Sequence, residues 1–180
     1  WGECEFSADV TMQQENRKVV VIDPEAIDRE ALAEAARLLR NGGLVAFPTE
    51  TVYGLGANAL DRSAVQRIFE AKDRPSGHPL IVHAPDAEQA RQFAAAWPSE
   101  AAELAEAFWP GPLTLIIEKS GEIPDRVTGG LPTVGIRVPS HPVARALLEQ
   151  AGVPVAAPSA NPHTRLSPTR AEHVIEGLGD

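Results

Sequence analysis

Three polar segments of the sequence could carry chemistry, and each lies beside a predicted buried strand. Residues 48–56 (PTETVYGLG) directly follow the apolar run 44–47, and residues 72–79 (KDRPSGHP) precede the apolar run 80–82. Residues 158–169 contain small hydroxyl and amide side chains, which suit hydrogen bonds to a polar ligand. Because α/β folds place their ligands at strand ends, these segments together favour a pocket for an anion.

Two cations give the second segment its anion-binding character. Lys72 and Arg74 are two residues apart, and Pro75 excludes further helix, so both are predicted to project from an extended segment toward one anion. Residues 62–83 hold four basic against two acidic residues, and residues 131–170 hold four against one. The whole chain has 16 basic and 25 acidic residues, a net charge of −9, which argues against a general nucleic-acid coat.

Motifs for several other chemistries are absent from the sequence. It has no G-x-x-x-x-G-K-[ST] phosphate loop, and Gly54-Leu55-Gly56 is too short for a dinucleotide turn, so a tight turn where backbones approach closely is the plainer interpretation. The five histidines lack H-x-x-x-H and H-E-x-x-H spacing, and Cys4 is the single cysteine, so we predict no protein-bound metal site. Ser159 lacks the flanking glycines of a nucleophile elbow.

Strands alternate with helices along the chain, and this order predicts one α/β domain around a mixed sheet. Asp28 is the expected cap of a helix that buries Leu32 and Leu39, and Asp61 is the expected cap of a second helix. Further helices are expected at 86–95, 99–108 and 142–150, with a last one from Pro168 or Thr169, and strands at 19–22, 44–47, 80–82, 113–117, 134–138 and 153–157.

The length of 180 residues suits a single domain. No apolar run approaches the ~18 residues of a membrane span, and the single cysteine favours a reducing, cytoplasmic compartment. Residues 1–18 are expected to be a leader or a disordered arm, because the only methionine is Met12 and residues 1–11 show no clear period.

Five motifs, in order along the chain, resemble those of the Sua5/YrdC family of threonylcarbamoyl-AMP synthases in tRNA modification. They are 47–55 (FPTETVYGL), Lys72-x-Arg74 followed by 78–80 (HPL), 109–114 (WPGPLT), 134–139 (VGIRVP) and 159–161 (SAN). The resemblance runs from about Val19 to the C-terminus, and five motifs at family-like spacing are a specific signal. It implies a YrdC-like domain over 19–180, with a twisted mixed β-sheet flanked by helices around a concave cationic pocket.

The resemblance also implies a reaction, that of an L-threonylcarbamoyladenylate synthase, which is a nucleotidyltransferase. The amine of L-threonine captures CO₂ or bicarbonate as a carbamate, which attacks the α-phosphate of ATP, so threonylcarbamoyl-AMP and pyrophosphate leave. Partner threonylcarbamoyl-transferase proteins then pass the group to N6 of adenosine 37 in tRNAs that read ANN codons, and direct RNA binding is a further expectation. Mg²⁺ is expected with ATP. Two anions that must meet require cations and oriented donors more than an acid/base pair.

Matched motif by motif, the resemblance implies two groups of site residues. Contacts to threonine are expected from Thr51, His83, Arg137 and Ala157, with Arg137 as the bidentate partner of the carboxylate. Contacts to ATP are expected from Lys72, Arg74, His78, Thr133, Ser159, Asn161 and Ser167, with Lys72 and Arg74 as the electrostatic catalytic residues on the phosphates. The purely structural alternatives are an Arg137–Glu118 salt bridge and a strand-end His83 that bonds to backbone.

Two features depart from the family pattern. The family often has Ser-Gly after its S-x-N triplet, whereas residues 162–165 here read PHTR, so this loop is expected to close differently. The family domain also continues beyond the position of Asp180, with a further serine and arginine near the ligands. The C-terminal end of the domain is therefore expected to be missing from this sequence.

Two other functions stay open at this point. A carbamoyl-transfer domain of the hydrogenase-maturation type shares the fold, but acylphosphatase-like or zinc-finger-like modules normally flank it, and they are not expected here. A non-catalytic RNA-binding module would bind with an affinity that falls steeply with added salt, whereas threonine-dependent ATP turnover has no reason to do so. The net charge of −9, the single tyrosine and the lack of an aromatic stacking motif weigh against the RNA-binding module.

Overall fold

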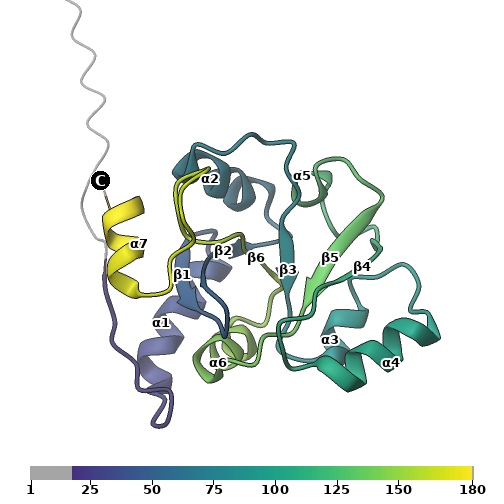
Figure 1. Cartoon of the computed structure of the whole chain (residues 1–180), viewed down its shortest axis with the longest axis horizontal. Coiled ribbons are helices and arrows are strands. Elements are labelled where there is room, and N and C mark those ends of the chain that lie inside the picture. Colours follow the sequence, from purple (N-terminus) through teal and green to yellow (C-terminus); the bar gives the residue numbers. More distant parts are fainter. Residues whose placement is uncertain (1–17, 180) are drawn as a thin grey trace, which may run out of the picture.

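A six-stranded mixed sheet forms the centre of the structure, a computed structural model that describes residues 18–179 (Figure 1). The strand order is β1-β2-β6-β3-β5-β4, and β3 pairs with β5 in parallel while every other neighbouring pair is antiparallel. The strands are β1 (Val45–Pro48), β2 (Tyr53–Asn58), β3 (Ile81–His83), β4 (Leu115–Glu118), β5 (Thr133–Arg137) and β6 (Val155–Ala156). The predicted α/β domain with a mixed sheet is confirmed.

Two of the seven helices in residues 18–179, α1 and α2, begin at the caps that the sequence predicts. The helices are α1 (Arg29–Arg40), α2 (Arg62–Lys72), α3 (Ala87–Arg91), α4 (Ser99–Phe108), α5 (Asp125–Thr128), α6 (Pro142–Ala151) and α7 (Ala171–Leu178). The Asp28 carboxylate accepts from the backbone N–H groups of Glu30 and Ala31, so it satisfies donors that α1 would otherwise leave unpaired. Asp61 caps α2 in the same way. Helix α5, a single turn, was not predicted.

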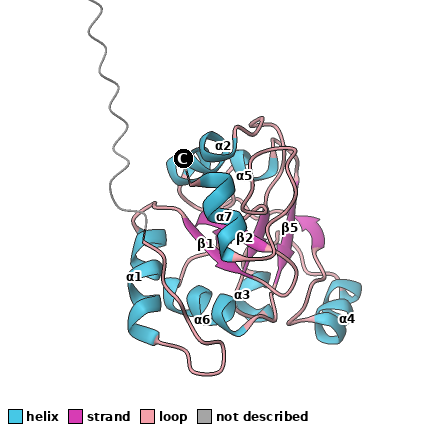
Figure 2. Ribbon diagram, turned by 60° about the vertical axis from the view of Figure 1, so that its left-hand side comes forward, coloured by secondary structure: helices cyan, strands magenta, loops and turns pink. Residues whose placement is uncertain are grey.

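Side chains on the two faces of the sheet pack into two separate cores. On one face, Val134 and Ile136 of β5 pack with Ile68 of α2. On the other face, Leu39 of α1 and Leu147 of α6 pack together. Figure 2 shows helices on both sides of the strands, with α1 and α6 on one side and α2 and α5 on the other.

The second face of the sheet is covered only in part. Helices α1 and α6 pack against the β1–β2 side of the sheet, whereas Ile116 on β4 is 76% exposed. Ile116 pairs with Gly135 of β5, and paired residues point to the same face, so this face is exposed at β4, whereas Arg137 at the end of β5 is buried.

Several sequence-based predictions are wrong in detail. Residues 19–22 form no strand, because the β-branched run has no partner in the described part of the chain and Val21 is 94% exposed. The segment 48–56 is not one loop, since its second half is strand β2. Strand β6 is shorter than the predicted 153–157, and the last helix begins at Ala171 rather than at Pro168 or Thr169.

Residues 1–17 of the expected leader lie outside the described residues, and Cys4 and Met12 are among them. Between residues 18 and 179, no helix has both the length and the apolar character needed to cross a membrane.

Candidate functional site

Alternation along β3 and β5 places several predicted site residues on one face of the sheet. Thr133, Gly135 and Arg137 share a face of β5, and the register pairs Ile81 with Gly135 and His83 with Arg137. Gly135 has no side chain, and a Cβ added there would lie 3.2 Å from Cγ2 of Thr114, so the Thr114 side chain packs beside the middle of β5. Thr133 and Arg137 lie roughly 13 Å apart along the strand. This face of β3 and β5 therefore forms an elongated floor with a polar residue at each end.

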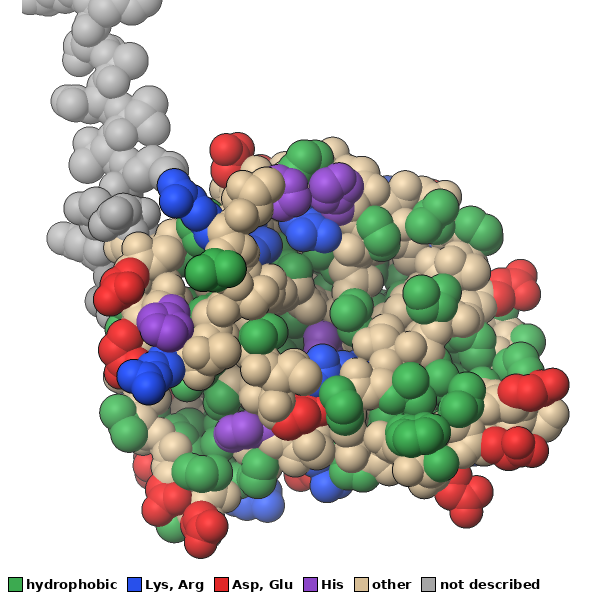
Figure 3. All heavy atoms as spheres, in the orientation of Figure 1, with side chains coloured by type: hydrophobic (Ala, Val, Ile, Leu, Met, Phe, Trp, Pro, Cys, Tyr) green, Lys and Arg blue, Asp and Glu red, His purple; other side chains and the backbone are tan. Residues whose placement is uncertain are grey.

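The space-filling view shows that this face is hollowed at its middle (Figure 3). Acidic, basic and histidine side chains gather at the lower part of the hollow, and a second group of basic and histidine side chains lies above it. In the same orientation, Figure 1 shows α2 and α5 above the hollow and α6 below it. The site therefore has an upper end near α2 and a lower end near α6.

Arg137, the last residue of β5, forms the lower end of the site. It is 8% exposed, its Nη2 lies 2.8 Å from Oε1 of Glu50, and the same nitrogen donates to Oγ1 of Thr51 at 3.2 Å. The predicted structural alternative, a salt bridge to Glu118, does not form, because Glu118 pairs with Thr133 at the opposite end of β5. Sequence reasoning thus brought Thr51 and Arg137 together correctly but missed Glu50.

The turn between β1 and β2 carries Glu50 and Thr51 to the end of β5. Thr49 holds this turn, because its Oγ1 donates to the carbonyl of Val52 at 2.6 Å and accepts from the backbone N–H groups of Thr51 and Val52. The signal in the sequence for Glu50 was its place between two threonines directly after a buried strand. Its pairing with Arg137 depends on the hairpin, which the sequence did not predict.

His83 is buried beside Arg137, and its imidazole is neutral at neutral pH. It is 4% exposed, its ring meets the Phe47 ring edge-on at 6.0 Å, and its Nδ1 lies 3.3 Å from the carbonyl oxygen of Ile81. Burial, with the charge of Arg137 as a smaller cause, lowers the pKa of His83 to about 4. The ring can therefore shape the lower end of the site and exchange hydrogen bonds without adding charge.

Ala157 follows β6 and lies close to the β1–β2 hairpin. Its backbone N–H donates to the carbonyl of Ile81 at 2.9 Å. A Cβ added at Gly54 would lie 3.4 Å from the Ala157 Cβ, and one added at Gly56 would lie 2.8 Å from Cε1 of Phe47. The Gly54-Leu55-Gly56 segment lies in strand β2, so the prediction of a tight turn is wrong, and its glycines allow side chains of neighbouring strands to pack closely.

Lys72 lies at the upper end but not as predicted. It is the last residue of α2 and is 1% exposed, so the prediction of a cation on an extended segment is wrong. Its Nζ donates to the carbonyl oxygens of Ser159, at 2.5 Å, and Asn161. Burial, with Arg74 as the smaller cause, lowers the pKa of Lys72 to about 8. An ammonium has three N–H donors, and two of those of Lys72 are used in these bonds.

Arg74 follows the end of α2 and is partly exposed. Its Nη2 donates to the carbonyl oxygen of Pro79 at 3.3 Å, and its buried Nε has no hydrogen-bond partner among residues 18–179. Lys72 and Arg74 therefore bind different segments, residues 159–161 and Pro79, yet Arg74 lies near enough for its charge to lower the pKa of Lys72.

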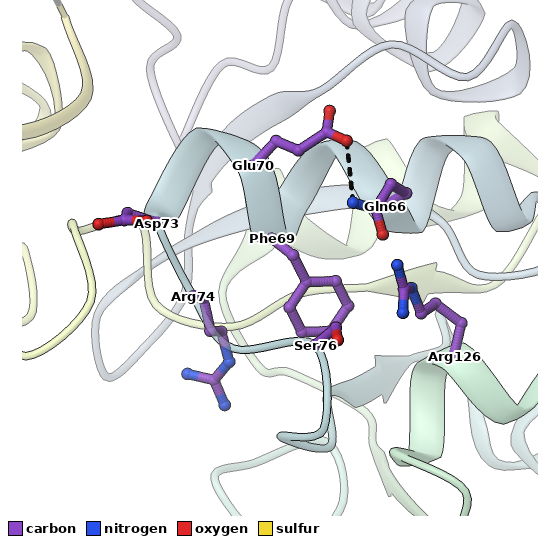
Figure 4. Close-up of a pocket in the computed structure, with 7 residues that line it drawn as sticks. All are labelled: Gln66, Phe69, Glu70, Asp73, Arg74, Ser76 and Arg126. Atoms are coloured by element: carbon purple, nitrogen blue, oxygen red, sulfur yellow. Dashed lines mark hydrogen bonds between the residues drawn. The ribbon is translucent and has the colours of Figure 1, made fainter.

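A shallow pocket of about 300 Å³ borders Arg74 between α2 and α5. Its lining residues are Gln66, Phe69, Glu70, Asp73, Arg74, Ser76 and Arg126. Figure 4 shows Arg74 and Arg126 on either side of the Phe69 ring, with the Arg126 guanidinium 5.6 Å from the ring centroid. Gln66 donates to Glu70 at 2.8 Å along the helix. This pocket shares Arg74 with the upper end but is separate from the pair Arg137–Glu50.

The loop after β6 joins the upper end to the hairpin. Ser159 pairs with Gly54, and the backbone N–H of Ala160 donates to the carbonyl of Tyr53 at 2.8 Å. The side-chain Nδ2 of Asn161 donates to the carbonyls of Pro162 and Arg165, each at 2.8 Å.

One polar atom of the Asn161 side chain, Oδ1, lacks a hydrogen-bond partner among residues 18–179. Asn161 is 8% exposed, and its buried Oδ1 has no partner in the described part of the chain. The loop it closes contains Thr164 with a φ of 69°, a left-handed conformation that is rare for a β-branched residue. The loop at residues 162–165 thus contains one residue, Thr164, in the left-handed conformation.

The remaining predicted residues lie around the upper end. The His78 and His163 rings are 5.3 Å apart, and the backbone N–H of His163 donates to the carbonyl of Lys72, so segments 72–79 and 158–169 lie together. Thr133 begins β5 and is half-buried, while Ser167 is exposed beside Pro168, whose carbonyl accepts from Tyr53. No group of three or more metal-ligating His, Cys, Asp or Glu side chains occurs within residues 18–179.

The fold is thus an α/β domain whose site has an arginine–carboxylate pair at one end and the two cations Lys72 and Arg74 at the other. A family model described as "Telomere recombination" and named Sua5_yciO_yrdC matches residues 37–180. The chain belongs to the Sua5/YciO/YrdC family.

Individual relatives support the same assignment. The chain is 52% identical to proteins named threonylcarbamoyl-AMP synthase from Pyrococcus abyssi, over 88% of this chain and 46% of the relative, and from Bacillus subtilis, over 89% and 46%. A crystal structure of P. abyssi Sua5 complexed with L-threonine is similar with a TM-score of 0.86 at 52% identity, covering 89% of this chain and 47% of that chain. The chain thus spans about half the length of these relatives.

Proposed function

We propose that this chain forms threonylcarbamoyl-AMP and pyrophosphate from L-threonine, bicarbonate or CO₂, and ATP. The observation that carries the proposal is the contact between Thr51 and Arg137 beside the buried His83, in a chain 52% identical to proteins named for this product. The product would supply the threonylcarbamoyl group for N6 of adenosine 37 in tRNA, through partner transferase proteins in the cytoplasm.

The lower end of the site is proposed to bind threonine. Arg137 is buried and fixed at a strand end, and its Nε has no partner among the described residues, so it can form a bidentate pair with a carboxylate. Thr51 presents a hydroxyl at 3.2 Å from the same guanidinium. Neutral His83 and the backbone at Ala157 would complete the wall without repelling the substrate.

The upper end is proposed to bind ATP. Arg74 and the remaining N–H of Lys72 would stabilise negative charge on the phosphates, and such preorganised donors act most strongly where charge develops in the transition state. The other residues proposed to contact ATP are His78, Thr133, Ser159, Asn161 and Ser167. Mg²⁺ would arrive with ATP, because Mg²⁺ is commonly bound through substrate phosphates and water.

The dependence of pyrophosphate release on the amino acid tests this proposal. Valine is nearly isosteric with threonine but lacks the hydroxyl, so a site that hydrogen-bonds the hydroxyl is expected to reject valine by more than ~10²-fold. Serine keeps the hydroxyl and loses one methyl, worth ~1 kcal/mol, so serine is expected to be the best of the wrong substrates. Equal rates with valine and serine would contradict the assignment of the lower end to threonine.

A further inference from the structure

Glu50 and Arg137 place two opposite charges side by side at the lower end of the site. The Glu50 side chain is 19% exposed and the Arg137 side chain is 10% exposed, and Oε1 lies 2.8 Å from Nη2. Burial raises the pKa of Glu50, but the Arg137 guanidinium and the backbone N–H groups of Glu50 and Ser140 together lower it below its usual value, so the carboxylate is charged at neutral pH. Both members of the pair are thus present as ions in a half-closed site.

This pair is incomplete as a purely structural salt bridge. By strict geometry neither Glu50 oxygen nor the Arg137 Nε has a hydrogen-bond partner in the described part of the chain, although the Arg137 Nη2 and the backbone N–H of Ser140 lie near the carboxylate. Buried charges that lack hydrogen bonds carry a large desolvation cost. A polar ligand that supplies one acceptor and one donor would satisfy both residues.

The two histidines near Arg137 carry no negative charge, so Glu50 is the anion that faces a ligand here. His83 is neutral, and its Nδ1 lies against a backbone carbonyl. His141 already accepts the backbone N–H of Val143 at 3.3 Å through its Nδ1, and burial lowers its pKa. Neither histidine can therefore pair as an anion with a positively charged group of a ligand. Glu50 can, because it is a carboxylate, and it is in direct contact with Arg137.

A free α-amino acid has the charges that match this arrangement. Its carboxylate and its ammonium are joined through one carbon, so a site that binds the zwitterion needs a cation and an anion a few ångströms apart. We propose that Glu50 binds the ammonium group of the amino acid while Arg137 binds its carboxylate. The inference rests on the proposed function and adds a substrate-binding residue to it.

The same assignment predicts that the amino group moves from the lower end toward the upper end of the site once it has become a carbamate. When the ammonium and CO₂ become a carbamate, two protons pass to water and a negative charge replaces the positive one. Glu50 then repels the group that it bound before, while Lys72 and Arg74 at the upper end attract it. Glu50 thus selects the free amino acid and favours movement of the carbamate toward the phosphates.

Calorimetry with two ligands tests whether Glu50 contacts the ammonium. The ligands are L-threonine and the analogue in which a hydroxyl replaces the ammonium, 2,3-dihydroxybutyrate of matching configuration. The Glu50→Gln chain is expected to lose about 10- to 100-fold in threonine affinity, the effect of one charge-assisted hydrogen bond. Its affinity for the analogue is expected to stay within about threefold of the wild type. Glu103→Gln, an exposed change on α4, is the matched control and is expected to bind both ligands as the wild type does.

An equal loss for both ligands in Glu50→Gln would overturn the proposal, because a residue that only orients Arg137 affects every carboxylate alike.

Glu50→Asp keeps the charge but shortens the side chain, so it is expected to retain a preference for threonine over the analogue. Loss of that preference would contradict the proposal. Because binding needs no ATP, threonine binding with this preference but without adenylate formation would overturn the synthase function and leave the role of Glu50 standing.

Discussion

At the scale of single residues, the two cations Lys72 and Arg74 have different surroundings. Lys72 is buried, and two backbone carbonyls accept from its ammonium, so it fixes residues 159–161 against α2 as well as offering charge. Arg74 is more exposed and holds one carbonyl, that of Pro79. A substitution at Lys72 should therefore affect folding, whereas one at Arg74 should affect mainly catalysis.

Alanine substitutions separate these two roles. Arg74→Ala is expected to slow pyrophosphate release by about 10²- to 10³-fold, with a free energy of unfolding within about 1 kcal/mol of wild type. Lys72→Ala is expected to slow the reaction and also to lower the free energy of unfolding by roughly 1–3 kcal/mol, because two carbonyls lose a charged donor. Rate assays and urea unfolding measure both, with Arg37→Ala on the exposed side of α1 as control. Unchanged stability in Lys72→Ala would contradict its buried role.

The buried His83 makes stability depend on pH. Its pKa is about 4 in the folded chain, against about 6.5 when unfolded, so between these values the unfolded chain binds more protons. The free energy of unfolding is therefore expected to fall, by roughly 2–4 kcal/mol, as the pH is lowered from 7 to 4.

Urea unfolding across this pH range measures the effect against two variants. His83→Gln removes the titrating group and is expected to flatten this part of the profile. His173→Gln, on the exposed face of α7, is expected to keep the wild-type slope. A wild-type slope in His83→Gln would show that the ring is not the group responsible.

At the scale of elements, the sequence predicted those whose signals are local. The caps Asp28 and Asp61 and the apolar periodicity identified α1 and α2, and both are confirmed. Strand β2 was missed because its sequence, YGLGAN, has two glycines and no β-branched residue, so it is a strand only through its pairing with β1 and β6. The run 19–22 has the opposite character, with strong β propensity and no partner among the described residues.

The close packing of this hairpin gives a prediction for Gly56. A Cβ added there would lie 2.7 Å from Cγ1 of Val155 and 2.8 Å from Cε1 of Phe47, so Gly56→Ala is expected to lower the free energy of unfolding by about 1–3 kcal/mol. Nothing lies within 4 Å of a Cβ added at Gly121, so Gly121→Ala is the control and should be nearly neutral. Equal stability of the two variants in urea would mean that β2 and β6 can separate at little cost.

At the scale of the whole molecule, the site is assembled from segments that are far apart in the sequence. The motifs predicted which residue types matter, including Thr51 and Arg137, which the structure places in contact. They could not predict the Glu50–Arg137 pair or the burial of Lys72, because both depend on strand register and on the path of residues 158–161. The roles of the upper-end residues stay predictions of the proposed function.

The central claim is that this chain joins threonine, one inorganic carbon and AMP. Mass spectrometry of a reaction with L-threonine, ATP and ¹³C-labelled bicarbonate tests it most directly. We expect threonylcarbamoyl-AMP heavier by the one labelled carbon, with pyrophosphate formed in equal amount. Pyrophosphate without a labelled adduct, or no adduct in the presence of all three substrates, would contradict the claim.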